Sequence, residues 1–272
     1  RDEGIMDLQL SGKRVLISGA ERGTGAVIAG TLAREGAAVA LHGFSREKAE
    51  GEAARLRDEG LTAHAVSGDL LTDEGARQAY EEAVTALGGL DILINNYGVA
   101  DGKKWASAET DDWEASYNHN VLTAQRLSRL VMDPMKELGW GRILNLGTIG
   151  STQPAAERPH YYAAKGAMAA MTVSLAKELG GTGVTVNLLS PGLIRTAEVE
   201  EWIARLAAKR GWGESWEERE REAVKLFGGN LTGRIATREE VADAAAFLCS
   251  PRAGAINAVN LRIDGGSVAL VT

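Results

Sequence analysis

One cysteine, Cys249, is present in the 272 residues of this chain, so a disulfide bond within the chain is excluded. The residue ends the apolar run Ala246-Phe247-Leu248, which is typical of a buried helix position. Long apolar stretches are also missing: none approaches the length of a membrane span, and the N-terminus lacks the apolar core of a signal peptide. These absences predict a protein of the reducing cytoplasm.

Basic residues are also fewer than acidic residues. Thirty lysines and arginines stand against 37 aspartates and glutamates, which gives a net charge of −7, and no long basic run occurs. Nucleic acid and an anionic membrane are therefore poor candidate partners. The hydrophobic content of 44% is that of an ordinary globular protein with ample chain for a core. We expect no metal site and assign no structural role to residues 1–5, which precede Met6.

A glycine-rich segment follows the first apolar run of the chain. Val15-Leu16-Ile17 leads into Ser18-Gly19-Ala20-Glu21-Arg22-Gly23-Thr24-Gly25, and an apolar helical pattern then continues to Gly36. Glycines in this context allow a tight turn and let a pyrophosphate approach the positive end of the helix. The segment therefore indicates a dinucleotide-binding unit; the alternative is a plain strand–helix turn with glycines that serve packing.

Strands and helices alternate along most of the chain. Apolar runs predict strands at residues 15–17, 37–41, 62–66, 90–95, 142–146, 184–189 and 260–263. Amphipathic patterns predict helices at residues 26–36, 45–59, 72–87, 111–138, 159–179 and 238–250. This alternation predicts an α/β fold: one doubly wound parallel sheet of about seven strands with helices on both faces. No linker or repeat interrupts residues 1–272, so we expect a single domain whose ligands bind beyond the carboxyl ends of the strands.

Residues 196–231 break the alternation. The segment is helical, rich in glutamate, and contains Trp202, Trp212 and Trp216. An insertion after the carboxyl end of a strand suits a mobile lid over a site. The alternative is a solvated helical hairpin that its tryptophans anchor, and the two interpretations are compatible.

Tyr161 and Lys165 are four residues apart in a predicted helix, so they share one face. An ammonium there can favour the phenolate and bring a phenol with an ordinary pKa of about 10 toward acid–base work. Taken alone, the spacing is weak evidence, because a tyrosine and a lysine four residues apart are more often two side chains on a solvated helix face.

Several motifs, in order, resemble those of the short-chain dehydrogenase/reductase family, and the resemblance covers almost the whole chain. The matching segments are Ser18 to Gly25, Asn95-Asn96-Tyr97-Gly98, Tyr161 with Lys165, Ser190-Pro191-Gly192 with Thr196, and Asp264-Gly265-Gly266. The resemblance implies a Rossmann fold and an NAD(P)-dependent oxidoreductase that acts on a carbonyl or secondary alcohol.

The resemblance also implies a catalytic tetrad. Tyr161 would be the general acid/base, whereas Tyr162 is excluded because Gly166 stands four residues after it. Lys165 would lower the pKa of the tyrosine and bind the nicotinamide ribose. Asn120, seven residues after Trp113, would anchor a water that passes protons, with Asn118 as the alternative.

The fourth member of the tetrad is a hydroxyl residue thirteen positions before the tyrosine, which is Thr148 here. It stands in place of the family serine, and Ser151 is the alternative if the loop differs in register. Two further departures are Tyr97 in place of a small alanine and the segment at residues 255–258, which lacks the usual Gly-Gln. None of these departures removes a functional group of the tetrad.

Cofactor choice depends on the end of the second strand. NAD-binding sites usually have an acid there, but the segment at residues 41–46 contains none. Arg22, Arg46 and Ser45 instead suit the 2′-phosphate of NADP(H), unless both arginines are ordinary surface charges. NADP(H) is therefore favoured, and NAD(H) is possible. The implied cofactor contacts are Gly19, Glu21, Arg22, Gly23, Thr24, Gly25, Ser45, Arg46, Asp69, Leu70, Asn96, Gly98, Tyr161, Lys165, Pro191, Gly192, Ile194 and Thr196.

Within this set, Asp69 would accept a hydrogen bond from the adenine amino group, and Ile194 and Thr196 would contact the nicotinamide carboxamide. The lid tryptophans, Tyr97 and Trp105 indicate an apolar or ring-bearing substrate. An acidic lid would disfavour a strongly anionic one unless local arginines reverse this, and a 3-oxoacyl thioester remains an option.

Two alternatives from other classes remain at this point. One is an NAD-dependent alcohol dehydrogenase of the same family, and the other is a non-catalytic sensor that binds a dinucleotide. The family also implies a homotetramer or homodimer in which the helices at residues 111–138 and 159–179 pack across a two-fold axis. Small residues on the second of these helices would allow close approach: Ala163, Ala164, Ala167, Ala169 and Ala170.

Overall fold

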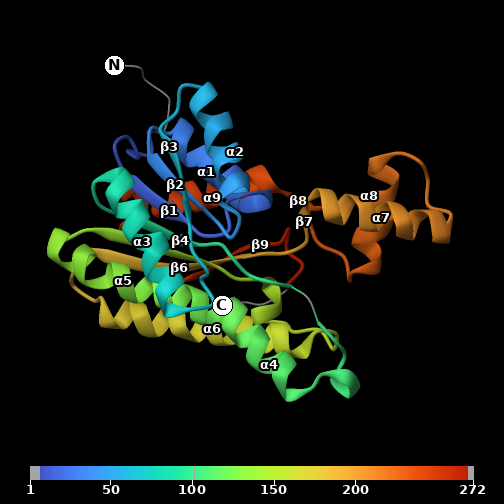
Figure 1. Ribbon diagram of the computed structural model, residues 1–272. Helices are drawn as coiled ribbons and strands as arrows, with labels where there is room; N and C mark the ends of the chain where they lie inside the picture. Colours follow the sequence, from blue (N-terminus) through green and yellow to red (C-terminus); the bar gives the residue numbers. More distant parts are fainter. Residues whose placement is uncertain (1–6, 101, 269–272) are drawn as a thin grey trace.

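Seven parallel strands form the central sheet in a computed structural model that describes residues 7–100 and 102–268 (Figure 1). The strand order is β3-β2-β1-β4-β5-β6-β9. The chain adds strands outward in one direction from β1 to β3 and in the opposite direction from β4 onward, so the switch point lies between β1 and β4. This order confirms the doubly wound parallel sheet and places a ligand-binding crevice beyond the carboxyl ends of β1 and β4. The strands are β1 Arg14–Ile17, β2 Ala38–Gly43, β3 Ala63–Ser67, β4 Ile92–Asn95, β5 Gly141–Leu146, β6 Val184–Pro191 and β9 Asn260–Ile263.

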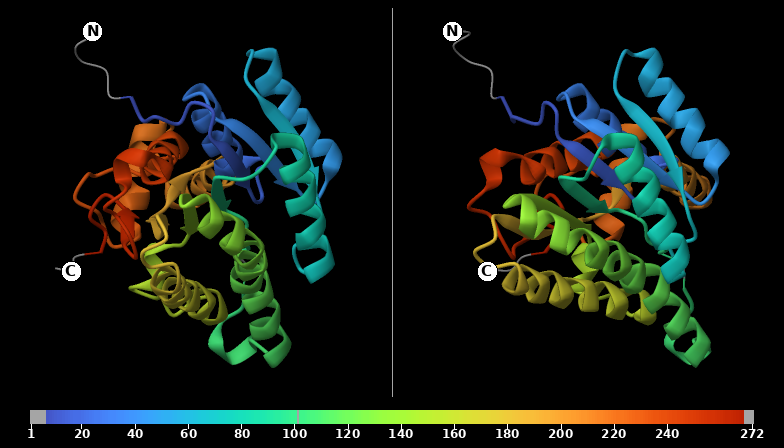
Figure 2. Two further views of the ribbon diagram at one scale, coloured as in Figure 1. Left: turned by 90° about the vertical axis from the view of Figure 1, so that its left-hand side faces the viewer. Right: turned by 60° about the vertical axis from the view of Figure 1, so that its left-hand side comes forward.

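Helices cover both faces of this sheet (Figure 2). One face carries α1 Gly23–Arg34, α2 Arg46–Asp58 and α9 Arg238–Cys249, and the other carries α3 Asp73–Leu87, α5 Thr123–Leu138 and α6 Pro159–Glu178. Short 3-10 turns lie at η1 Trp105–Ser107, η3 Ile149–Ser151 and η4 Pro251–Ala253. Among the described residues, no helix is both long and apolar enough to cross a membrane.

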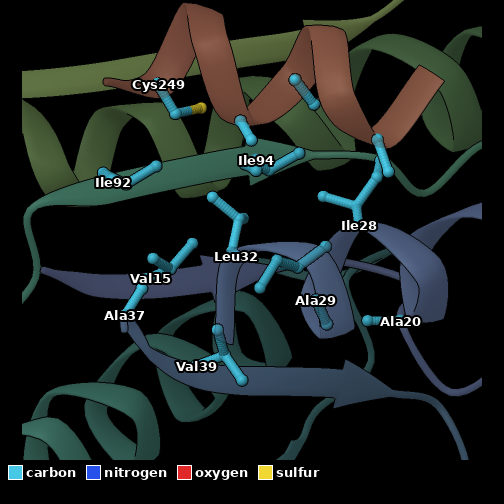
Figure 3. Packing of buried hydrophobic residues seen from close by; sticks show 14 of the residues in the cluster. Val15, Ala20, Ile28, Ala29, Leu32, Ala37, Val39, Ile92, Ile94 and Cys249 are labelled. Carbon is cyan, nitrogen blue, oxygen red and sulfur yellow. The ribbon is translucent and has the colours of Figure 1, made fainter. Parts of the chain in front are cut away.

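The strands read as continuous apolar runs because successive side chains enter two different cores. Ile17 packs with α1 and α9, while its neighbour Leu16 packs with the helices of the opposite face. Figure 3 shows the first of these cores, where Ile28 and Leu32 of α1 and Cys249 of α9 cover the strands. Burial raises the pKa of the Cys249 thiol to about 12, so this cysteine is an inert packing residue.

The helix expected at residues 111–138 is broken in the structure. It consists of α4 Thr110–Tyr117, a π-helical segment η2 Asn118–Leu122, and α5. The Asn120 amide donates to the Ser116 carbonyl, and the Thr123 hydroxyl donates to the His119 carbonyl, both at 3.0 Å or less. These side-chain bonds accompany the widened turn, and such turns are frequent at functional sites.

The insertion forms a helical hairpin that projects from the body of the protein (Figure 1). It consists of α7 Ala197–Arg210 and α8 Trp216–Leu226, and the short parallel strands β7 Ile194–Arg195 and β8 Ala236–Thr237 pair at its base. Trp212 and Trp216 pack on a small core of Ile203, Ala223 and Ile235. The third lid tryptophan, Trp202, lies 5.0 Å from Phe227, centroid to centroid. All three tryptophans therefore contribute to the packing of the hairpin itself.

Candidate active site

The glycine loop connects β1 to α1 at the switch point of the sheet. Gly19 has φ of +63°, a left-handed conformation that glycine adopts without strain. Gly25 has no room for a side chain, since an added Cβ would lie 3.0 Å from the Cα of Ala20 and closer still to the Gly19 carbonyl oxygen. The N-terminus of α1 has no side-chain cap. Loop and helix end, with Thr24 in the first turn, together fit the pyrophosphate of a dinucleotide.

The end of β4 holds this loop in place. The Asn96 amide donates to the carbonyl oxygens of Ser18 and Gly19, both at 2.9 Å. The backbone N–H of Tyr97 donates to the Ser18 hydroxyl at 3.0 Å. The Asn96 side chain therefore positions the loop from the neighbouring strand.

His42, which the sequence reasoning missed, braces the loop from the other side. It is the penultimate residue of β2, is fully buried, and accepts a hydrogen bond from the Gly19 N–H through Nδ1 at 3.3 Å. Its Nε2 lies 2.8 Å from the Gly68 carbonyl, directly before Asp69. Burial lowers the pKa of His42, so the neutral ring with the proton on Nε2 satisfies both contacts. A polar residue inside an otherwise apolar strand was the available signal for this role.

Thr148 and Tyr161 meet in the wall of one cavity. Thr148 follows β5 and caps η3, where its hydroxyl accepts from the Gly150 N–H at 3.3 Å. Its side chain also lies close enough to Tyr161, in the first turn of α6, to lower the pKa of that phenol. The alternative hydroxyl, Ser151, donates to the Thr148 carbonyl at 2.7 Å and is committed to the backbone. The expected thirteen-residue offset therefore corresponds to a contact between the two hydroxyl side chains.

Lys165 and Asn120 lie on either side of Gly98. A Cβ added at Gly98 would be 2.7 Å from Asn120 Oδ1 and 3.0 Å from Lys165 Nζ, so only glycine fits between them. Asn120 is fully buried, and its side chain pairs with both backbone groups of Val99 at 3.0 Å. Asn118 instead faces Arg126, which donates to its amide oxygen at 2.8 Å. Asn120 is therefore the asparagine next to the lysine.

Burial shifts the pKa values of the tyrosine and the lysine in opposite directions. Desolvation raises the pKa of Tyr161 to about 12, although Arg158 and the Thr148 hydrogen bond act against it. Desolvation lowers the pKa of Lys165 to about 8. The family resemblance implies that Lys165 lowers the tyrosine pKa. In the structure its ammonium is instead engaged by the Leu146 carbonyl at 2.8 Å, and burial dominates the pKa of the phenol.

The cavity beside Tyr161 has a volume of about 630 Å³ and extends from the sheet edge to the insertion. Tyr162, which is excluded as the general acid/base because Gly166 stands four residues after it, forms part of the cavity wall. The lid contributes Val199, Val224 and Phe227, while Trp202, Trp212 and Trp216 are not part of the lining. The Tyr97 ring lies 4.7 Å from the Phe44 ring, centroid to centroid, and its hydroxyl hydrogen-bonds to His119. The Trp105 ring packs against the Trp113 ring. Neither Tyr97 nor Trp105 is part of the cavity lining.

The two arginines expected at the 2′-phosphate point in different directions. Arg22 pairs with Glu198 of α7 at 3.0 Å, and both side chains are about 70% exposed. Arg46 pairs with Glu82 of α3 at 2.5 Å and lies against that helix. The Glu21 carboxylate reaches the end of β2, where it accepts from the Ser45 N–H at 3.0 Å. An exposed ion pair is weak, so Arg22 is the arginine that can readily exchange its partner.

The remaining expected cofactor contacts lie along the same edge of the sheet. Asp69 is exposed, and one of its carboxylate oxygens accepts from the Leu71 N–H at 3.0 Å, while Leu70 is buried in the core. Pro191 ends β6, and the next residues of that segment line the cavity: Gly192, Ile194 and Thr196.

The two shifted pKa values give a pH dependence for carbonyl reduction. If Tyr161 is the proton donor and Lys165 its charged partner, as the sequence predicts, reduction requires a protonated Tyr161 and a charged Lys165. The lysine is an ammonium below its pKa of about 8 and neutral above it, while the tyrosine stays protonated up to about 12. We expect kcat/KM for reduction to fall about tenfold per pH unit above about pH 8. A rate that stays flat or rises between those two pKa values would contradict this assignment.

A dinucleotide-binding loop on the same sheet edge as a buried tyrosine–lysine helix is the arrangement of a nicotinamide-dependent oxidoreductase. Residues 19–268 match the family model described as "Enoyl-(Acyl carrier protein) reductase". The chain is 32% identical to the 3-oxoacyl-[acyl-carrier-protein] reductase FabG of Aquifex aeolicus, with 96% of this chain and 99% of that protein covered. It belongs to the short-chain dehydrogenase/reductase family and is an NAD(P)-dependent oxidoreductase.

Two solved structures have the same fold over almost their full length. One is L-sorbose reductase from Gluconobacter frateurii in complex with NADPH and L-sorbose, with a TM-score of 0.90 at 29% identity, covering 98% of this chain and 100% of that one. The other is gluconate 5-dehydrogenase from Burkholderia cenocepacia in complex with NADP and tartrate, with a TM-score of 0.86 at 30% identity, covering 97% and 98%.

Proposed function

We propose that this protein is an NADPH-dependent reductase that converts a carbonyl group to a secondary alcohol. The observation that carries the proposal is that Thr148 and Tyr161 lie together in the wall of one cavity, on the same sheet edge as the glycine loop. A panel of aldehydes, ketones and oxo acids, assayed with NADPH by absorbance, tests it. Tight NADPH binding without turnover of any carbonyl would favour the sensor alternative.

The residues divide the work of such a reaction. The nicotinamide supplies the hydride when it is bound. Tyr161 gives its proton to the carbonyl oxygen as negative charge develops there, and the Thr148 hydroxyl holds the same oxygen. The raised pKa of Tyr161 supports a proton donor over a base. Lys165 supplies a positive charge under the tyrosine, and Asn120 next to it links this charge to a path for protons.

Cofactor preference is expected to depend on Arg22. Its exposed pairing with Glu198 can be exchanged for a phosphate, and the two related structures hold NADPH and NADP. We expect NADPH to bind at least about tenfold more tightly than NADH, and Arg22→Ala to remove most of that difference, since a phosphate contact is a charge-assisted bond. Arg46→Ala is the comparison, with a smaller effect because Glu82 holds that arginine. Equal affinity for both cofactors in the unchanged protein would overturn the preference.

Substrate choice is expected to follow the cavity lining. Leu193, Val199, Val224 and Phe227 form an apolar side, which supports a substrate with an apolar portion next to its carbonyl group. These residues, and not the lid tryptophans, are therefore the ones that support an apolar or ring-bearing substrate. The related proteins described above are named for 3-oxoacyl, sorbose and gluconate substrates, which supports a ketone or alcohol within a chain.

The insertion and the outer helices complete the proposal. Residues 196–231 would act as a lid of the single domain, with the β7–β8 pair at its base as the hinge. On α6, Ala163, Ala170 and Val173 are exposed and form a small-residue face, which supports a second copy across α5 and α6 in a homodimer or homotetramer. A cytoplasmic location remains part of the proposal because the buried Cys249 needs no oxidising environment.

A further inference from the structure

We propose that Arg158 is a substrate-binding residue that selects carbonyl compounds carrying a carboxylate, so that the preferred substrate is an oxo acid. The inference rests on the proposed carbonyl reductase function and adds the charge of the substrate to it. Arg158 and Tyr161 line the same cavity, so one ligand can place its carbonyl at the tyrosine and its carboxylate at the arginine.

Arg158, an exposed residue, is the one cation among the described residues that line this cavity. Apart from the tyrosines, the ionisable residues of the lining are Arg158 and Asp264. Both Asp264 oxygens are committed to a turn, because they accept from the backbone N–H groups of Gly266 at 2.9 Å and Val268 at 3.1 Å. The aspartate therefore forms no ion pair with the guanidinium, which leaves the guanidinium available to pair with an anion.

Arg158 also has no carboxylate partner within residues 7–100 and 102–268. Two acidic groups at the start of the lid pair with other arginines: Glu198 with Arg22, and Glu200 with Arg195 at 2.5 Å. The acidic lid, which the sequence reasoning expected to disfavour anionic substrates, therefore places no acidic group in the cavity lining. One unpaired guanidinium matches one carboxylate in a bidentate pair, whereas a doubly charged phosphate would leave excess negative charge.

The backbone at Arg158 supports a functional role. The residue has φ of +58° and ψ of +49°, a left-handed conformation that is unfavourable for a residue with a side chain. Glycine or asparagine would adopt it more readily, yet an arginine occupies the position directly before Pro159, the first residue of α6. Such strain is retained at functional sites when the surrounding structure enforces it.

The charge of Arg158 also lowers the pKa of Tyr161, which offers a second way for the residue to affect turnover. That effect acts on every carbonyl substrate equally, because it changes the proton donor. Direct binding acts only on substrates with a carboxylate. The comparison of an acid with its uncharged ester therefore separates the two roles.

The test uses levulinate, its longer-chain homologues and the methyl ester of each, with NADPH and the full-length protein. We expect kcat/KM to be higher for the best acid than for its ester, and Arg158→Gln to lower the value for the acid by about tenfold to a hundredfold while the ester changes little. Arg158→Lys should restore part of the activity on the acid. Arg221→Gln, which removes an exposed lid charge outside the cavity, is the matched control and should change neither.

The variant Arg158→Gly tests whether the loss of activity on the acid comes from a folding defect. Glycine adopts the left-handed conformation freely, so this variant should melt no lower than the unchanged protein and still lose its preference for the acid. Equal losses for acid and ester, or a preference for the ester in the unchanged protein, would overturn the inference while leaving the reductase function intact. If neither acids, esters nor neutral carbonyls are reduced, both proposals fail.

Discussion

Replacing Tyr161 with phenylalanine is expected to lower turnover by about a hundredfold to ten-thousandfold, the usual contribution of a positioned proton donor. The change removes one oxygen atom and leaves the ring in its place on α6. Thr148 then keeps a hydroxyl toward the substrate but cannot replace the proton, because an aliphatic alcohol is a far weaker acid than a phenol. Steady-state kinetics with NADPH and any substrate found in the carbonyl panel measure the effect.

Tyr162→Phe is the matched control for this experiment. Tyr162 lies next to Tyr161, lines the same cavity, and its ring is 5.3 Å away, centroid to centroid. Gly166 stands where the lysine of a catalytic pair would be, so we expect a change of only a few-fold. Dinucleotide affinity should be nearly the same in both variants. Unchanged turnover in Tyr161→Phe would remove the tyrosine from the mechanism.

The second large effect is expected from Gly25→Ala. The new methyl group would overlap the backbone at Gly19 and Ala20, and a backbone cannot rotate away as a side chain can. The glycine loop must then open, so we expect NADPH affinity to fall at least about tenfold and the free energy of unfolding to fall by about 1–3 kcal/mol. Fluorescence titration and thermal unfolding measure the two quantities.

Gly51→Ala provides the contrast. Gly51 lies in the middle of α2, and an added Cβ there has no neighbour within 4 Å. The same chemical change should therefore raise stability by about 0.5–1 kcal/mol and leave NADPH binding as it was. If Gly25→Ala bound NADPH as tightly as Gly51→Ala does, the glycine loop would not be the pyrophosphate site.

Features that depend on local pattern were predictable from the sequence. The alternation of apolar runs and amphipathic helices predicted all seven strands of the main sheet in order, because each strand is buried on both faces. The pairing of Thr148 with Tyr161 was also within reach, since the family spacing located both residues. The widened turn between α4 and α5 was not, because no periodicity in the sequence marks it and the Asn120 amide at its centre also bonds to Val99, a residue on another segment.

Features that depend on long-range contacts escaped the sequence reasoning. His42 touches Gly19 and Gly68, which are 23 and 26 residues away, and no spacing rule connects them. Arg46 was expected at the cofactor because it follows β2, but its direction is set by Glu82 on another helix. The pKa of Tyr161 depends on burial, which outweighs the nearby charges and cannot be read from a four-residue spacing.

The most direct test of the account follows the hydride itself. NADPH carrying deuterium at the transferable position of its nicotinamide is incubated with the protein and a carbonyl substrate from the panel, and the product is examined by mass spectrometry. The account predicts deuterium on the new carbinol carbon with the unchanged protein, and at most a small fraction of that rate with Tyr161→Phe. An alcohol product without deuterium, or equal labelling rates in the two proteins, would contradict it.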